Sequence, residues 1–203
     1  MFKSATQILA SIQRGEMSSD EALTELLNRI TQVNPKINAV VQLDVERATT
    51  RAKAADEALA KGESWGPLHG LPMTVKDAFE VEGVLSTSGA HVWKNHIPNT
   101  NAEPIQKLVD AGAIIFGKTN VPIFSGDWQA FNDIYGHKPS HGIIPMNGHL
   151  PPPPGATAGQ DTLSVVGPLA RTAGDLELMM DVLAGPVKSQ SKGWQLELPP
   201  ARH

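Results

Sequence analysis

One lysine lies where its amine could act as a base. Lys76 ends an apolar run, residues 71–76, that follows a turn rich in glycine and proline and is typical of a short strand. A lysine in an apolar site loses the hydration of its ammonium group, so its pKa falls and the neutral amine can accept a proton. The spacing alone favours a simpler interpretation, in which Lys76 ends a strand in solvent and pairs with Asp77.

Residues 112–119 match the phosphate-loop pattern G-x-x-x-x-G-K-[ST]. That motif needs a strand, then a loop, then a helix. Here the four residues between the two glycines are themselves a predicted strand, a predicted helix precedes them, and Pro122 follows soon after. We therefore interpret the match as chance and predict no cofactor from it.

Three histidines, His137, His141 and His149, raise the hypothesis of a metal-dependent hydrolase. His137 and His141 have the spacing of one helical face, but Pro139 and Gly142 disfavour a helix there. No His-Glu-x-x-His pattern occurs in the chain. Because imidazoles need a rigid shared geometry to bind a metal, we expect the histidines to serve as hydrogen-bonding groups and predict no metal site.

The other common nucleophiles are absent or lack their motifs. The chain has no cysteine, which excludes a thiol nucleophile, and it has no G-x-S-x-G elbow. Ser86, Ser88 and Ser140 lie in turn-like stretches, where serine hydroxyls commonly bond to the nearby backbone.

Composition narrows the class of protein. With 203 residues, 40% of them hydrophobic and 19% charged, the chain has the composition of an ordinary globular domain. Its net charge of −4 argues against nucleic acid as a partner. No apolar run approaches the length of a membrane span, and the first residues have no apolar leader region, so we expect a cytoplasmic protein with no membrane partner.

Alternating helices and strands must position these residues, and the alternation predicts an α/β fold. Two helices are expected to begin at the capping boxes Ser4/Gln7 and Ser18/Glu21, and the second is expected to end at Asn34-Pro35. Further helices are expected over 44–61, around 105–109 and over 173–183, and strands over 39–41, 73–76 and 113–116.

Several longer motifs occur in a fixed order. Residues 66–77 match G-P-L-x-G-[IL]-P-x-x-[VL]-K-D, and residues 117–120 are G-K-T-N. Residues 132–136 match N-x-x-Y-G, residues 136–145 match G-x-K-P-[ST]-x-G-x-[VI]-[PS], and residues 167–176 match G-P-[LM]-[AT]-R-[ST]-x-x-D-[LA]. Together the motifs span nearly the whole chain.

In this order, the motifs resemble those of the amidase signature family. Residues 149–155 look more like stand-alone bacterial amidases than the glutaminase component of a transamidosome. The resemblance implies a large mixed sheet covered by helices on both faces. It also implies hydrolysis of a small amide to a carboxylate and ammonia or an amine, without a cofactor. Lys76 would then be the base of a Ser–cis-Ser–Lys triad.

The sequence departs from the family where the triad serines belong. In the family, both serines lie in a Gly/Ser-rich segment between the Tyr-Gly and G-x-K-P-[ST] motifs. Here Tyr135-Gly136 leads directly into His137-Lys138-Pro139, and no Gly-Gly-Ser occurs anywhere in the chain. This pattern predicts an internal deletion that joined two Tyr-Gly sites. Residues 194–203 predict a C-terminal truncation as well, because they stop within a family motif.

We therefore expect an incomplete amidase-signature domain over residues 1–186, followed by a truncated tail, 187–203. The domain is expected to comprise an N-terminal helical part (1–62), a core half that contains Lys76 (63–136), and a return segment with its helix (137–186). Strands without neighbours would leave such a chain partly ordered or dependent on a partner.

Three hypotheses for the function follow. The first is a carbon–nitrogen hydrolase by descent, inactive in this chain because Lys76 alone cannot replace a nucleophile. The second is a non-catalytic remnant or pseudoenzyme that binds an intact relative, in which a small amide is the substrate. The third, ranked last, is the metal-dependent hydrolase built on His137, His141 and His149.

Overall fold

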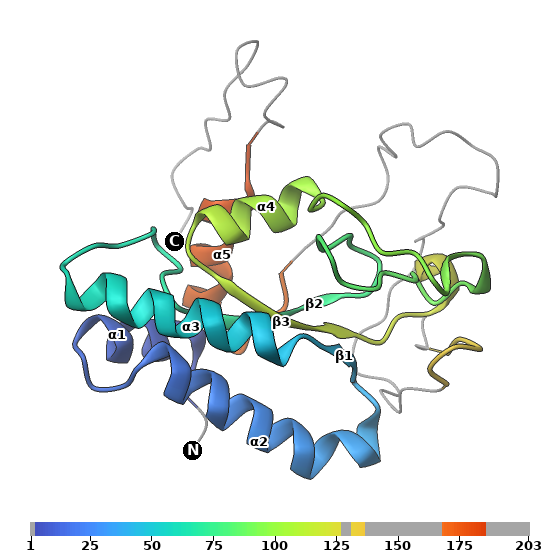
Figure 1. Cartoon of the computed structure of the whole chain (residues 1–203), viewed down its shortest axis with the longest axis horizontal. Coiled ribbons are helices and arrows are strands. Elements are labelled where there is room, and N and C mark those ends of the chain that lie inside the picture. The colour runs from blue at the N-terminus through green and yellow to red at the C-terminus, as the bar shows by residue number, and fades with distance from the viewer. Residues whose placement is uncertain (1–2, 127–130, 137–167, 186–203) are drawn as a thin grey trace.

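The computed structural model places a three-stranded sheet between two layers of helices (Figure 1). It describes residues 3–126, 131–136 and 168–185. The elements in chain order are α1 (Ala5–Gln13), α2 (Ser19–Ile37), β1 (Val40–Leu43), α3 (Val45–Ala60), β2 (Pro72–Lys76), the 3-10 helix η1 (His91–Trp93), α4 (Glu103–Asp110), β3 (Ile114–Thr119), the 3-10 helix η2 (Ile123–Ser125) and α5 (Ala173–Leu183). This architecture confirms the predicted α/β class.

The central strand of the sheet is β3. It pairs antiparallel with β1 and parallel with β2, so the strand order is β1-β3-β2. A parallel pair needs a crossover connection, and α4 lies in it. The strand expected over 113–116 is longer than predicted, because Gly117, Lys118 and Thr119 pair with β1 on one side and β2 on the other.

The two faces of the sheet carry separate apolar clusters. On one face, Leu23 of α2 and Ala52 of α3 pack with Ile114 and Phe116 of β3. Side chains alternate across a strand, so the intervening Ile115 joins the second cluster. Helices α1, α4 and α5 supply part of that cluster, whose buried members are Leu9, Leu68, Leu71, Val75, Val81, Ile105, Leu108, Ala113 and Met179.

The helix starts follow the predicted caps. The side chain of Ser4 accepts the N–H of Gln7, that of Ser18 accepts the N–H of Glu21, and both reciprocal capping-box bonds are present. At the start of α5, the Thr172 side chain accepts the N–H of Asp175. Among the helices in the described ranges, none is long and apolar enough to cross a membrane.

The predicted end of the second helix is wrong. α2 continues through Pro35 and ends at Ile37, followed by the capping residue Asn38, which has φ 42°. Proline removes one N–H donor, but the side chain of Asn34 secures the last turn. Its Oδ1 accepts the N–H groups of Ala39 at 2.9 Å and Val40 at 2.8 Å, and its Nδ2 donates to the Val40 carbonyl at 2.8 Å. The amide of Asn34 therefore connects α2 to β1.

Two glycines allow the turns before β2 and β3 to touch. Gly70 has φ +73°, and a Cβ there would lie 2.0 Å from Ser19 Oγ. Gly112 has φ +99°, and a Cβ there would lie 2.7 Å from the Cα of His69. The Gly70 N–H donates to the Gly112 carbonyl at 2.9 Å. These contacts align the start of β2 with the start of β3.

We expect Asn34→Ala to lower the free energy of unfolding by about 2 kcal/mol, because part-buried backbone groups between α2 and β1 lose their partners. Urea denaturation followed by circular dichroism measures the change. Asn28→Ala, at an exposed position of the same helix, is the matched control and should differ from the parent chain by less than about 0.5 kcal/mol. Equal losses in the two variants would contradict the role given to Asn34.

Candidate active site

The carboxyl ends of two parallel strands form the candidate site. Lys76 is the last residue of β2 and lies in register with Thr119, the last residue of β3. The loops that follow both strands therefore leave from the same edge, which is where α/β proteins commonly bind their ligands. Lys76 is half-buried at this edge. Its exposure therefore lies between the two placements that the sequence allowed, one in an apolar site and one in solvent.

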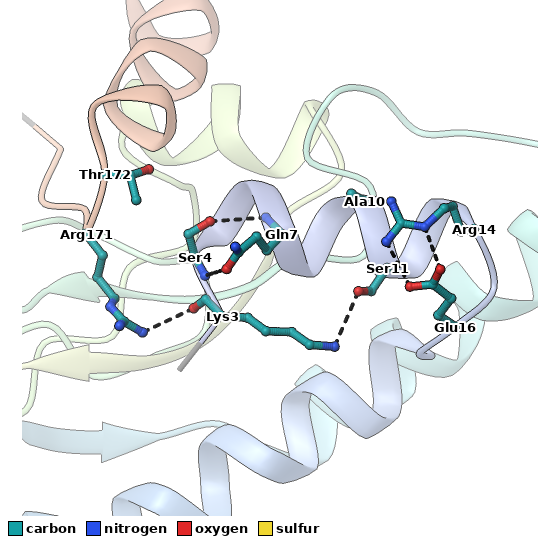
Figure 2. A pocket seen from close by; sticks show the side chains of 9 residues that line it. All are labelled: Lys3, Ser4, Gln7, Ala10, Ser11, Arg14, Glu16, Arg171 and Thr172. Carbon is teal, nitrogen blue, oxygen red and sulfur yellow. Dashed lines mark hydrogen bonds and ion pairs between the residues drawn. The ribbon is translucent and has the colours of Figure 1, made fainter. Parts of the chain in front are cut away.

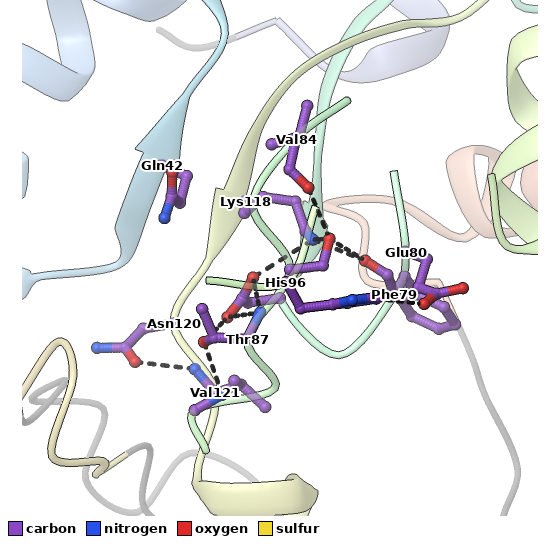
Figure 3. Close-up of polar contacts among 12 residues, drawn as sticks. Gln42, Phe79, Glu80, Val84, Thr87, His96, Lys118, Asn120 and Val121 are labelled. Atoms are coloured by element: carbon purple, nitrogen blue, oxygen red, sulfur yellow. Dashed lines mark hydrogen bonds and ion pairs between the residues drawn. The ribbon is translucent and has the colours of Figure 1, made fainter. Parts of the chain in front are cut away.

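Asp77 and Lys118 form a completely buried ion pair. Neither side chain has exposed surface, and Lys118 Nζ lies 3.3 Å from Asp77 Oδ1. The same ammonium donates to the Phe79 carbonyl at 2.6 Å and to Ser86 Oγ at 2.7 Å (Figure 3). Burial lowers the pKa of Lys118, and the Asp77 carboxylate opposes that shift. An ammonium has three N–H donors, and the three groups named here provide an acceptor for each of them. The arrangement suits a structural role for Lys118.

Asp77 also fixes the loop that follows β2. Thr87 donates its hydroxyl to Asp77 Oδ2 at 2.6 Å and its N–H to the same atom at 3.2 Å. The Ser88 N–H donates to the Asp77 carbonyl at 3.1 Å. Because Asp77 is the neighbour of Lys76 in the chain, these bonds fix the backbone that carries the candidate base.

A second network ties the N-x-x-Y-G motif to the same edge. Asn132 is fully buried; its Nδ2 donates to Asn120 Oδ1 at 2.9 Å, and its Oδ1 accepts the Tyr135 N–H at 2.7 Å. Gln42 of β1 donates to the Tyr135 hydroxyl at 2.7 Å. Asn120 Nδ2 donates to the Gly136 carbonyl at 3.4 Å. The chain is thus held beside the end of β3 up to Gly136.

A cavity of about 300 Å³ opens beside Asp77. It is lined by Asp77, Ala78, Glu80, Ser86, Ser88, Trp93 and His96. A larger hollow of about 690 Å³ lies along α1 and reaches Arg171 (Figure 2). There Arg14 is paired with Glu16 at 2.6 Å, at the surface. Of these two hollows, the smaller touches the candidate site through Asp77.

The phosphate-loop match is a chance match, as predicted. Gly117 and Lys118 lie within β3 itself, so no flexible loop follows a strand at this point. Ser86 donates to the Val84 carbonyl at 3.1 Å, which is the local backbone bond expected of a serine in a turn.

Two other histidines, His69 and His96, act as hydrogen-bonding groups. Buried His69 accepts the Trp65 N–H at Nδ1, so its Nε2 carries the proton that is donated to the Ala55 carbonyl, each at 3.0 Å. His96 contacts Glu80 at 2.7 Å. In the part of the chain that the structure describes, no group of three potential ligands is arranged to hold a metal. Outside the described residues lie His137, His141, His149 and Ser140.

The role of Lys118 is not predicted by its sequence context. Its partner Asp77 lies at the end of the neighbouring strand, some forty positions away in the chain, and local spacing does not reveal such a pairing. The available signal was a lysine two positions after the apolar run 113–116, where an unpaired charge would be costly to bury.

The chain belongs to the amidase family. The family model described as Amidase matches residues 21–127 and 129–200, which together make up most of the chain. The break in this match at residue 128 lies shortly before the predicted junction at Tyr135-Gly136.

The chain spans about half of the length of three relatives that it resembles. The acylamidase of Rhodococcus erythropolis is 30% identical over 227 aligned positions, which cover 90% of this chain and 48% of the relative. A glutamyl-tRNA(Gln) amidotransferase chain from Carboxydothermus hydrogenoformans is 28% identical over 249 positions, covering 98% and 50%. Fatty-acid amide hydrolase 2 of Homo sapiens is 30% identical over 244 positions, covering 92% and 45%.

Solved amidase structures share the fold of the described core. A crystal structure of an amidase is 32% identical with a TM-score of 0.62, covering 67% of this chain and 31% of its own. The native peptide amidase of Stenotrophomonas maltophilia is 25% identical with a TM-score of 0.62, covering 67% and 29%. The α/β sheet and its helices therefore correspond to part of an amidase-signature fold.

We expect Lys118→Met to lower the free energy of unfolding by about 3–5 kcal/mol, because it leaves the Asp77 carboxylate buried without its counter-ion. Chemical denaturation measures the loss. Lys53→Met, at an exposed position of α3, is the matched control and should be nearly neutral.

The double variant Lys118→Met/Asp77→Asn should recover part of the lost stability, since no unpaired charge then remains buried. If Lys118→Met were as stable as Lys53→Met, the structural role of the ion pair would be refuted.

Proposed function

We propose that this chain derives from a carbon–nitrogen hydrolase and, by itself, does not hydrolyse amides through serine chemistry. It keeps Lys76, the residue that matches the family's base. The observation that carries the proposal is the direct passage from Tyr135-Gly136 into His137-Lys138-Pro139, in a chain that contains no Gly-Gly-Ser.

The alignment lengths support a missing internal segment. The 249 positions aligned with the C. hydrogenoformans protein exceed the 203 residues of this chain. Part of the relative's sequence within that alignment therefore has no counterpart here. The two-part match to the family model, divided at residue 128, supports the same interpretation.

The chemistry explains why a lysine alone is insufficient. In an intact family member, the neutral lysine accepts a proton from the bridging serine, which activates the nucleophilic serine to attack the amide carbonyl. An acyl-enzyme forms, ammonia or an amine leaves, and water releases the carboxylate. Backbone N–H groups stabilise the oxyanion by about 3 kcal/mol per donor. Losing the nucleophile typically lowers turnover about a millionfold.

The geometry of the described residues fits one part of such a site, namely the strand end that carries the lysine. Lys76 ends β2 on a backbone that Asp77 and Thr119 hold in place. The Asn120–Asn132 network keeps the chain up to Gly136 at the same edge of the sheet. In an intact relative, the segment that follows the Tyr-Gly motif would therefore start on the edge that carries the lysine.

The purified chain should release no ammonia above background from a panel of small amides. A coupled glutamate dehydrogenase assay measures the release, with the R. erythropolis acylamidase as the positive control under the same conditions. Lys76→Ala should give the same background. Ammonia release by the parent chain that disappears in Lys76→Ala would show that the proposal is wrong.

A second candidate function is binding to an intact amidase. The observation that favours it is the edge of the sheet: among the described residues, β2 has a strand neighbour on one side only. An unpaired strand edge is a template for pairing with another chain. Val92 is 75% exposed and Leu169 90% exposed, and such apolar surface also favours association.

If binding is the function, the tagged chain should retain untagged R. erythropolis acylamidase after co-expression and affinity purification, and the two should elute together from a sizing column. An unrelated α/β protein of similar size is the control and should not be retained. Failure of the amidase to co-purify would remove this second candidate.

A further inference from the structure

We propose that the 300 Å³ cavity beside Asp77 binds a small organic ammonium ion. Its walls come from the loop after β2, including Glu80 and Ser88, and from the η1 region, with Trp93 and His96. The proposal needs neither Lys76 nor a serine nucleophile, so it stands independently of whether the chain hydrolyses amides.

The charges at this cavity favour a cation. Asp77 and Glu80 line it, and Lys118, behind Asp77 and Ser86, neutralises one of the two carboxylates. His96 Nε2 lies 2.7 Å from Glu80 Oε1 and is a cation only when protonated. With His96 neutral, Asp77, Glu80 and Lys118 together carry one net negative charge. The Glu80 side chain is 50% exposed, so a ligand can reach its carboxylate from solvent.

An aromatic wall adds a second attraction for a cation. The Trp93 ring packs against Phe124 in a T-shaped arrangement, with 5.5 Å between centroids, and is tilted relative to His96 at 6.3 Å. Trp93 nevertheless remains 44% exposed. A cation over an indole face is attracted by the quadrupole of the ring. The carboxylate of Glu80 and the indole of Trp93 thus form complementary walls for an ammonium and its apolar substituent.

The walls are hydrogen-bonded to one another without a ligand. The Ser86 N–H donates to the His96 carbonyl, the His96 N–H donates to the Trp93 carbonyl, and the Phe124 N–H donates to the Ser88 carbonyl, each at 2.9 Å. These bonds connect the loop after β2, η1 and η2. A cavity whose walls are already fixed loses less conformational entropy when a ligand binds.

The dimensions and chemistry select the ligand class. A volume of about 300 Å³ lies at the small end of the range for ligand cavities. A primary ammonium on a benzyl or short alkyl group can place its charge at Glu80 and its apolar part against Trp93. An anion of the same size would be repelled by Glu80, and a neutral alcohol would lose the charge interaction.

Isothermal titration calorimetry with benzylammonium tests the site, with benzyl alcohol and benzoate as isosteric comparisons at the same pH. Benzylammonium should bind at least tenfold more tightly than benzyl alcohol, and benzoate should not bind. Equal affinity for the alcohol, tighter binding of benzoate, or no binding of benzylammonium at millimolar concentration would overturn the proposal.

Two variants locate the binding. Glu80→Gln and Trp93→Leu should each weaken the affinity for benzylammonium at least fivefold. The matched controls, Glu63→Gln at an exposed position and Trp65→Leu before β2, should leave it unchanged. Circular dichroism establishes that each variant is folded. If Trp93→Leu does not fold, Glu80→Gln decides alone because its side chain is half exposed, and unchanged affinity in that variant would overturn the proposal.

Discussion

The buried ion pair between Asp77 and Lys118 is the interaction on which the rest of the site depends. It joins the end of β2, the central strand β3 and the loop that begins at Phe79. Burying either charge alone would be costly, but here each has its counter-ion and further hydrogen bonds, from Thr87 to the carboxylate and from the ammonium to Ser86. This ion pair adjoins the backbone of Lys76 and the walls of the small cavity. It also lies where β2 pairs in parallel with β3.

Features encoded by neighbouring residues were predictable from the sequence, whereas features that depend on distant partners were not. The capping serines Ser4 and Ser18 need only residues three positions away. By contrast, the extension of β3 to Thr119 depends on hydrogen bonds to both flanking strands, and the passage of α2 through Pro35 depends on the Asn34 amide reaching β1. For the candidate site, motif resemblance indicated Lys76, which is found at the end of β2. The structural role of Lys118 was not predictable, because its partner Asp77 follows another strand.

The chain combines the core of the amidase family with a catalytic set that we propose is incomplete. The described core superposes on solved amidases, and within this chain the Asp77–Lys118 pair and the Asn120–Asn132 bond hold the strand ends together. We infer that positioning of the lysine and catalysis are separable here. The ion pair and the asparagine network depend on residues within this chain, whereas the family's chemistry requires serines from a segment that we propose this chain lacks. The proposed ammonium site is likewise lined by residues of this chain.

The most direct test of this account is intact-protein mass spectrometry after treatment with a serine-reactive fluorophosphonate. Such a probe forms a covalent adduct with a serine that a neighbouring base has activated. We predict no change in the mass of this chain under conditions in which the R. erythropolis acylamidase is labelled stoichiometrically. A stoichiometric adduct on one serine of this chain that is lost in Lys76→Ala would contradict the account, because it would reveal an activated nucleophile paired with the retained lysine.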